Sequence, residues 1–82
     1  MYNMTELTFQ ELVIIYKYKN KDIDDFKESI KKENNTIIYK LYLAYNKDYN
    51  LELPDVIYQD KKYLYKLINI LKKELKQRKI LN

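Results

Sequence analysis

The chain has 82 residues, a net charge of +4, and no Cys, His or Gly. Without Cys there is no disulfide or thiolate site, and without Gly there is no glycine-rich phosphate loop. Without His, and with Ser29 as the single serine, the common general base and the Ser–His relay are missing. We therefore expect a binding protein with no catalytic residue, metal or cofactor.

The composition predicts one folded domain, residues 1–82, in the cytoplasm. An apolar fraction of 46% is typical of a folded chain. No apolar run is long enough to suggest a membrane span, and the first ten residues lack the layout of a signal peptide. Ile, Lys, Asn and Tyr, which have A/T-rich codons, account for 43 of the 82 residues. The ten tyrosines are therefore weak evidence for base stacking.

The first predicted helix covers about residues 6–18. Thr8 and Glu11 have the spacing of a capping box, in which each side chain accepts a hydrogen bond from a backbone N–H of the first turn. Four apolar residues then follow at helical spacing, Phe9, Leu12, Val13 and Tyr16. The polar residues 19–21 end this helix.

The second predicted helix covers residues 22–32, with Asp22 as its N-cap. Three more acids near its start suit the positive end of the helix dipole: Asp24, Asp25 and Glu28. A cation site is the alternative reading of these acids. Because the glycine and the late glutamate of a calcium loop are missing, we favour a capped helix start. A narrow apolar stripe of Ile23, Phe26 and Ile30 predicts one buried face.

Residues 36–47 are apolar on almost every side, which predicts a helix in the middle of a bundle. One side of this helix would carry Ile37, Leu41, Ala44, Tyr45 and Asp48, and the opposite side Tyr39 and Leu43. The same residues suit a strand, but no strand mate lies nearby, so we favour a helix. The surplus apolar face also allows a homodimer.

The fourth predicted helix ends near residue 79 and begins at either residue 54 or residue 60. Pro54 suits the first position of a helix. The apolar stripe of this helix is Leu64, Leu67, Ile68, Leu71 and Leu75, flanked by Tyr63 and Ile70. The predicted architecture is thus an all-α bundle of about four helices.

The lysines of the fourth helix lie on the face opposite its apolar stripe. Residues 61–79 hold eight basic side chains and one acid, Glu74. The candidate binding residues are Lys61, Lys62, Lys66, Lys72, Lys73 and Lys76. Such a face suits phosphate groups or an acidic protein surface. The alternative is a lysine-rich helix face that simply contacts solvent.

Two segments carry a resemblance to a known family: ELVIIYKYKNKDIDDFKESIKKENNTIIYKL at 11–41 and QDKKYLYKLINILKK at 59–73. The chain resembles the N-terminal half of small sigma factors and the related helix-turn-helix proteins of conjugative elements. In that family the long helix docks on RNA polymerase through a run of acid and Gln residues. The resemblance implies a polymerase-like contact at Gln59 and Asp60, and RNA polymerase, a sigma-like partner protein or DNA as partner.

These observations together predict a small transcription-associated regulator that acts by binding. The basic face of the fourth helix would contact nucleic acid or a partner protein, with no membrane involved. The alternative is a phage- or plasmid-encoded inhibitor that covers the nucleic-acid site of a host protein. In that case the acidic patch, Asp22, Asp24, Asp25 and Glu28, would imitate phosphate groups.

Overall fold

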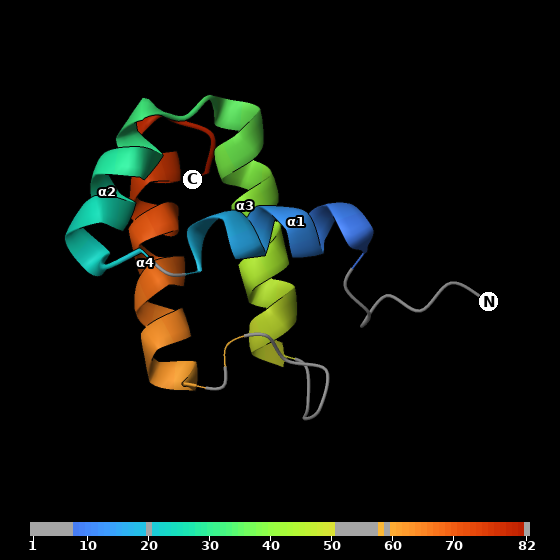
Figure 1. Cartoon of the computed structure of the whole chain (residues 1–82). Coiled ribbons are helices and arrows are strands. Elements are labelled where there is room, and N and C mark those ends of the chain that lie inside the picture. Colours follow the sequence, from blue (N-terminus) through green and yellow to red (C-terminus); the bar gives the residue numbers. More distant parts are fainter. Residues whose placement is uncertain (1–7, 20, 51–57, 59, 82) are drawn as a thin grey trace.

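Four helices form the described part of the chain in the computed structural model. They are α1 (Phe9–Tyr18), α2 (Ile23–Lys32), α3 (Asn35–Asn50) and α4 (Lys61–Gln77) (Figure 1). The structure describes residues 8–19, 21–50, 58 and 60–81, and none of these forms a strand. The all-α prediction is therefore confirmed, including a helix rather than a strand at 36–47. Within the described ranges, no helix combines the length and hydropathy that a bilayer crossing requires.

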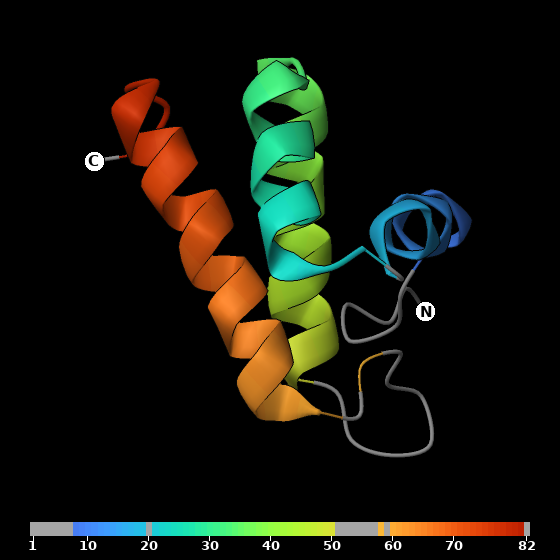
Figure 2. The same cartoon turned by 60° about the vertical axis from the view of Figure 1, so that its left-hand side comes forward.

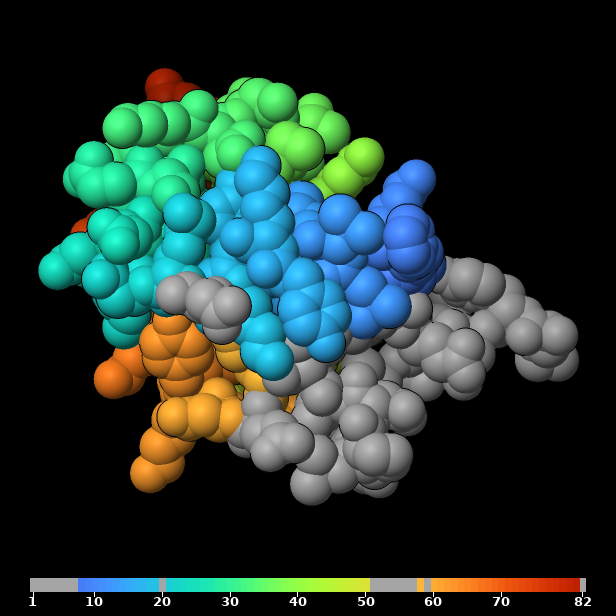
Figure 3. All heavy atoms as spheres, in the orientation of Figure 1, coloured from blue at the N-terminus to red at the C-terminus, as the bar shows by residue number. Residues whose placement is uncertain are grey.

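The helices α3 and α4 form an antiparallel hairpin that the other two helices cover. α2 packs against α4, and α1 crosses α3 (Figures 1 and 2). In the view of Figure 2, α4 and α1 lie on opposite sides of α3. The space-filling view shows α1 across the front of the molecule, next to α2 (Figure 3). The outer surfaces of α1 and α4 therefore belong to different faces.

Three of the four helices bury the faces that their apolar periodicity predicts. The buried residues are Phe26 and Ile30 of α2, Ile38, Leu41, Ala44, Tyr45 and Asp48 of α3, and Leu64, Leu67, Ile68, Leu71 and Leu75 of α4. Tyr39 and Leu43 lie on the opposite side of α3 and are exposed. Apolar side chains at three- and four-residue spacing share one side of a helix, so burying that side removes them together from water.

The first helix buries a different face from the one that its apolar spacing suggests. Ile15 and Tyr18 are its buried residues, whereas Phe9, Val13 and Tyr16 are exposed. On the buried side the polar groups find partners: the Glu11 carboxylate accepts a hydrogen bond from Lys47 Nζ of α3 at 2.8 Å, and the Tyr18 hydroxyl donates to Glu33. Side chains at i, i+4 and i+7 share a face, so residues 11, 15 and 18 lie together on the side of α1 that packs on the rest of the fold.

Side-chain caps fix the starts of the helices. The capping box of Thr8 and Glu11 is present, so α1 begins at Phe9 rather than at residue 6. The Asp22 side chain accepts from the backbone N–H of Asp25, and Asn34 Oδ1 accepts from that of Ile37. Both satisfy helix-start N–H groups that lack a partner within the helix.

The last helix begins at Lys61, with Asp60 as its N-cap. The backbone of Asp60 is extended, with φ −82° and ψ 93°, and its side chain accepts from the N–H of Tyr63. A helix running without interruption from residue 54 is therefore wrong, because an extended residue interrupts the backbone ladder. Residues 54–57 lie outside the described part of the chain. The predicted stop near residue 79 lies two residues beyond the observed end at Gln77.

A row of aromatic rings links α1, α2 and α3 through the core and extends to Tyr58, which precedes α4. Tyr18 packs edge-on to Phe26 at 5.8 Å between ring centroids, and Phe26 stacks on Tyr45 at 6.1 Å. Tyr45 packs edge-on to Tyr58 at 5.4 Å, and their hydroxyls are 3.2 Å apart. The Tyr18 hydroxyl donates to Glu33 Oε1 at 2.6 Å. These tyrosines therefore serve packing, because each phenol finds a polar partner inside the fold.

Candidate nucleic-acid interface

Five of the six predicted binding lysines are exposed on α4: Lys62, Lys66, Lys72, Lys73 and Lys76. The helical period puts them on the side opposite the buried leucines. Glu74 is the single acid of α4, and its carboxylate accepts from Arg78 Nε at 2.7 Å. The exposed side of α4 is therefore uniformly basic, and the structure brings these five predicted residues together.

Lys61 differs from the other five lysines because its ammonium group serves the fold. Lys61 Nζ donates to the backbone carbonyls of Asp48 at 3.0 Å and Tyr49 at 2.6 Å. It also lies 5.4 Å from the centroid of the Tyr49 ring. These carbonyls belong to the last turn of α3, where a cation offsets the negative end of the helix dipole. Lys61 thus ties the start of α4 to the end of α3.

The second helix adds two exposed lysines, Lys27 and Lys31, to the basic surface. They line a hollow of about 500 Å³ between α2 and α4. On the α4 side, the same hollow is lined by Lys73, by Ile70, by the amides of Asn69 and Gln77, and by Glu74, whose carboxylate is paired with Arg78. The basic surface therefore comprises Lys62, Lys66, Lys72, Lys73 and Lys76 of α4 with Lys27 and Lys31 of α2. Sequence periodicity missed the α2 contribution because it depends on how two helices pack.

Two exposed tyrosines border the basic surface. Tyr65 of α4 is 53% exposed and Tyr49 of α3 is 38% exposed, and their ring centroids are 5.9 Å apart. On α4, Tyr65 is the neighbour of Lys66 and lies one turn from Lys62. Lys61 Nζ lies over the Tyr49 ring, so the more exposed Tyr65 is the ring of this pair on which an unpaired base could stack. Composition alone could not separate these two tyrosines from the buried ones.

The acidic patch lies at the start of α2, and all four of its carboxylates are exposed: Asp22, Asp24, Asp25 and Glu28. The predicted N-cap role of Asp22 is confirmed. The other three fall on the side of α2 away from Phe26 and Ile30. None of the three forms an ion pair with another described residue.

The predicted polymerase-like contact is described only in part. Asp60 is exposed and caps α4, with Oδ1 3.1 Å from the backbone nitrogen of Tyr63. Gln59 lies outside the described residues. A carboxylate at a helix N-terminus is held in place by the N–H group that it accepts from. This hydrogen bond therefore fixes the orientation of the Asp60 side chain. Its role in binding a polymerase stays a prediction.

Arg78, the single arginine of the chain, is a structural residue that sequence reasoning missed. Its two terminal nitrogens donate to the backbone carbonyls of Ile30 and Lys31 at 3.1 Å and of Glu33 at 2.7 Å. The planar guanidinium presents five donors, so it can satisfy several carbonyls at a helix end at once. The sequence offered one hint of this role: the chain has fifteen lysines and a single arginine.

Hydrogen bonds to carboxylates shift two pKa values near α1. The Tyr18 hydroxyl, and then Lys17, lower the pKa of Glu33 despite its partial burial. Partial burial raises the pKa of Glu11, but its bonds to Lys47 and Thr8 outweigh that effect and lower it overall. Both carboxylates are therefore ionised at neutral pH and hold α1 in place. Neither lies in the basic surface.

Comparison with known protein families, curated proteins and solved structures finds no match for this chain. The chemistry of the surface is therefore the basis for interpreting it. Ammonium groups, side-chain amides and exposed phenol rings can neutralise phosphates, donate hydrogen bonds and stack on bases. These are the functions of a binding surface.

Proposed function

We propose that this protein is a small helical nucleic-acid-binding regulator that acts in transcription. One observation carries the proposal: Lys27 and Lys31 of α2 line one hollow with Lys73 of α4, the helix that also carries four more exposed lysines and the exposed ring of Tyr65. A lysine-rich helix that merely contacts solvent needs neither lysines from a second helix nor an exposed aromatic ring. The resemblance to the N-terminal half of small sigma factors supports the transcriptional role.

The basic surface favours single-stranded over double-stranded nucleic acid. Lysine is a compact charge that neutralises phosphate without reading sequence. The exposed Tyr65 ring can stack on an unpaired base, whereas the bases of a duplex are already stacked on each other. Base stacking on a tyrosine contributes about 1–3 kcal/mol. We therefore expect binding that depends on salt and tolerates different sequences.

Charge reversal on the basic surface tests the proposal. We expect Lys73→Glu to weaken binding of single-stranded DNA and to reduce the slope of log K against log salt, since a phosphate contact is lost. Lys32→Glu, an equal charge change on an exposed α2 residue that does not line the hollow, is the matched control. Electrophoretic shift and anisotropy at several salt concentrations measure both. Equal losses for the two variants would contradict a localised site.

The preference for single strands has its own test. Tyr65→Ala removes an exposed ring and should weaken binding of single-stranded DNA about tenfold or more, while binding of duplex DNA changes little. Tyr39→Ala is the control, because it also removes an exposed ring, but one that is not part of the Tyr65–Tyr49 pair. Equal effects on single-stranded and duplex DNA would show that Tyr65 does not stack on bases.

A second candidate function is inhibition of a host protein, which the exposed acids of α2 favour. Asp24, Asp25 and Glu28 are turned to solvent without ion-pair partners among the described residues. Such a row of carboxylates can occupy a site made for phosphates. A pull-down with core RNA polymerase, using Glu28→Lys and Lys73→Glu, separates the two functions. Loss only with Glu28→Lys favours the inhibitor.

A further inference from the structure

The exposed side of α1 is an apolar stripe on the surface. Phe9 is 79% exposed, Val13 54% and Tyr16 57%. Their i, i+4 and i+7 spacing puts them on one line along the helix. Single exposed apolar residues are ordinary on a protein surface, but a continuous stripe of large ones marks an interaction site.

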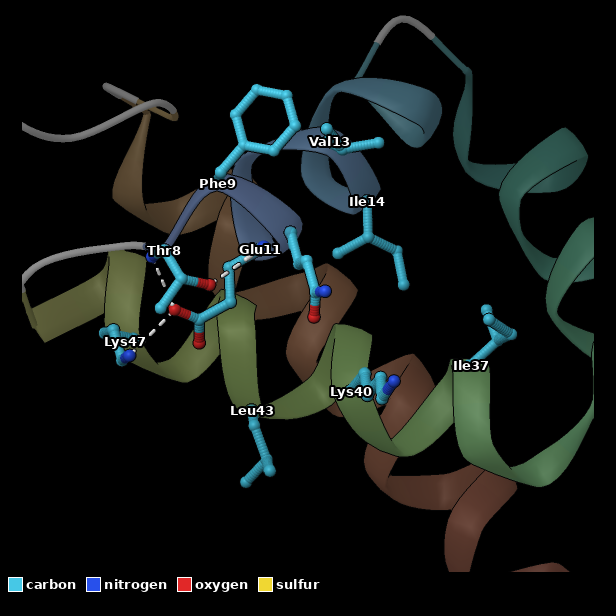
Figure 4. A pocket seen from close by; sticks show the side chains of 10 residues that line it. Thr8, Phe9, Glu11, Val13, Ile14, Ile37, Lys40, Leu43 and Lys47 are labelled. Atoms are coloured by element: carbon cyan, nitrogen blue, oxygen red, sulfur yellow. Dashed lines mark hydrogen bonds and ion pairs between the residues drawn. The ribbon is translucent and has the colours of Figure 1, made fainter.

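A groove between α1 and α3 lies beside this stripe. It encloses about 600 Å³, and its apolar walls include Val13 and Ile14 of α1 with Ile37 and Leu43 of α3. Figure 4 shows Ile14 and Ile37 pointing into the space between the two helices, while Phe9 points away from α3. The stripe and the groove are therefore continuous through Val13. A hydrophobic groove beside an exposed apolar stripe can bind one amphipathic helix.

The charge around the groove is positive. Three charged residues line it, Glu11, Lys40 and Lys47. Glu11 is already paired with Lys47. Lys40 lines the groove, is exposed, and forms no ion pair with any other described residue. The groove thus offers a positive charge to a partner, with no free carboxylate to oppose it.

We propose that this groove binds an acidic amphipathic helix of a partner protein. Apolar side chains at three- and four-residue spacing on the partner fill the space between Ile14 and Ile37. Carboxylates on its flanks meet Lys40. The site shares no residue with the basic surface of α4 and α2, so it does not depend on nucleic-acid binding.

Charge and shape favour this occupant over two others. A second copy of the chain would bring the same lysines together across a twofold axis, and like charges there oppose association. A membrane surface would cover the exposed stripe of α1 but would leave the groove between Ile14 and Ile37 unfilled. An acidic helix matches both the charge and the shape.

The test uses labelled peptides of about 15 residues, a length at which helices begin to be stable. One peptide carries leucine at helical spacing with glutamate on its other sides, and its control carries lysine in place of glutamate. Fluorescence anisotropy with the intact protein should show binding of the acidic peptide and about tenfold weaker binding of the basic one. Equal binding of both peptides, or no binding of the acidic one, overturns the proposal.

Protein variants locate the site. Lys40→Glu and Val13→Ser should each weaken binding of the acidic peptide about five- to tenfold. Lys32→Glu and Tyr39→Ser, exposed changes that do not line the groove, should leave it within about twofold. Because all four residues are exposed, helicity by circular dichroism should be unchanged. Equal losses in the groove variants and their controls place the binding elsewhere and overturn the proposal.

Two further measurements distinguish the other occupants. Sedimentation at two concentrations would reveal a dimer, and its loss with Val13→Ser would assign the groove to a second copy of the chain. Flotation with anionic vesicles, lost with the same variant, would assign it to a membrane surface. Either result overturns the acidic-helix proposal. A protein that is monomeric, does not bind vesicles and binds the acidic peptide supports the acidic-helix proposal.

Discussion

At the scale of single residues, Lys79 has a backbone φ of 63°, in the left-handed region. It follows the C-cap Arg78, and two hydrogen bonds close the end of α4 around it. The N–H of Lys79 donates to the carbonyl of Lys76 at 3.0 Å, and that of Ile80 to the carbonyl of Leu75 at 2.9 Å. This is the Schellman arrangement, whose left-handed position glycine occupies most easily. The chain, which has no Gly, uses lysine there.

Replacing Lys79 with glycine should stabilise the protein. The left-handed conformation costs a residue with a Cβ about 1 kcal/mol, and glycine avoids that cost while losing more chain entropy on folding. We expect Lys79→Gly to raise the free energy of unfolding by about 0.5–1 kcal/mol. Urea unfolding followed by circular dichroism measures it. Lys76→Gly, in the last turn of α4 itself, should destabilise instead, and a gain there would contradict this explanation.

Local spacing predicted the caps because a cap involves residues only three apart. Thr8 with Glu11, and Asp22, could both be identified before any helix was placed in space. The role of Arg78 could not, since its carbonyl partners lie more than forty positions away in the sequence. The role of Lys61 could not be predicted either. Periodicity placed it among the binding lysines, but in the folded chain its ammonium group donates to carbonyls at the end of α3.

At the scale of the elements, Arg78 holds the end of α2 against the end of α4. Three carbonyls at the C-terminal end of α2 and after it, those of Ile30, Lys31 and Glu33, accept from its guanidinium. The carbonyls of a last helical turn have no partner within the helix. Arg78 therefore caps the C-terminal end of α2, which in many helices is done by a glycine after the last turn.

Arg78→Lys should destabilise the fold although the charge is kept. Lysine has three donors at one point and cannot reach the carbonyls and Glu74 together, so partly buried acceptors lose their partners. We expect a loss of about 2–4 kcal/mol in the free energy of unfolding, measured by urea denaturation. The mirror change Lys73→Arg, at an exposed position of the same helix, should alter stability by less than about 0.5 kcal/mol. Equal stability of Arg78→Lys and the unaltered protein would contradict the role of Arg78.

The orientation of α1 shows where periodicity stops being informative. Its residues are apolar at so many positions that two different stripes fit a helix, and the buried one includes Ile15 and Tyr18. The buried stripe is the one whose polar groups have partners across the fold: Glu11 with Lys47, and Tyr18 with Glu33. For α2, α3 and α4 the polar residues left one apolar side, so the buried face could be predicted.

At the scale of the whole molecule, the tyrosine core makes stability sensitive to alkali. Burial raises the pKa of Tyr58 to about 12, and burial also raises the pKa of Tyr45 and Tyr18. A group whose pKa is higher in the folded state than in the unfolded chain stabilises the fold. Its contribution is complete when the pH is below the pKa of the unfolded chain, which is about 10 for tyrosine. That contribution is lost as the pH rises from about 10 through the folded value.

We therefore expect the free energy of unfolding to fall above pH about 10, by about 1.4 kcal/mol per pH unit for each such tyrosine. Tyrosinate absorbance and circular dichroism should change together, because the buried phenols ionise as the chain unfolds. Tyr45→Phe should flatten this dependence, and Tyr39→Phe, at an exposed position, should leave it unchanged. Ionisation of all ten tyrosines before any loss of helix would contradict the prediction.

The arrangement of the helices was less predictable than their existence. Four helices and most of the core follow from short-range patterns. The hollow between α2 and α4, the pairing of Tyr65 with Tyr49, and the groove between α1 and α3 come from packing between segments distant in the sequence. The candidate site was therefore predicted for α4 and missed where a second helix contributes to it.

The exposed lysines of α4 also couple binding to folding. Lys62 with Lys66, and Lys76 with both Lys72 and Lys73, are three or four residues apart, and like charges at such spacing each cost about 0.2–0.5 kcal/mol. The unfolded chain spreads these charges, so the repulsion is specific to the folded state. A polyanion that lies across them removes the repulsion and adds its own affinity for the folded form. The fold should therefore be more stable when the basic surface is occupied, with or without any change in shape.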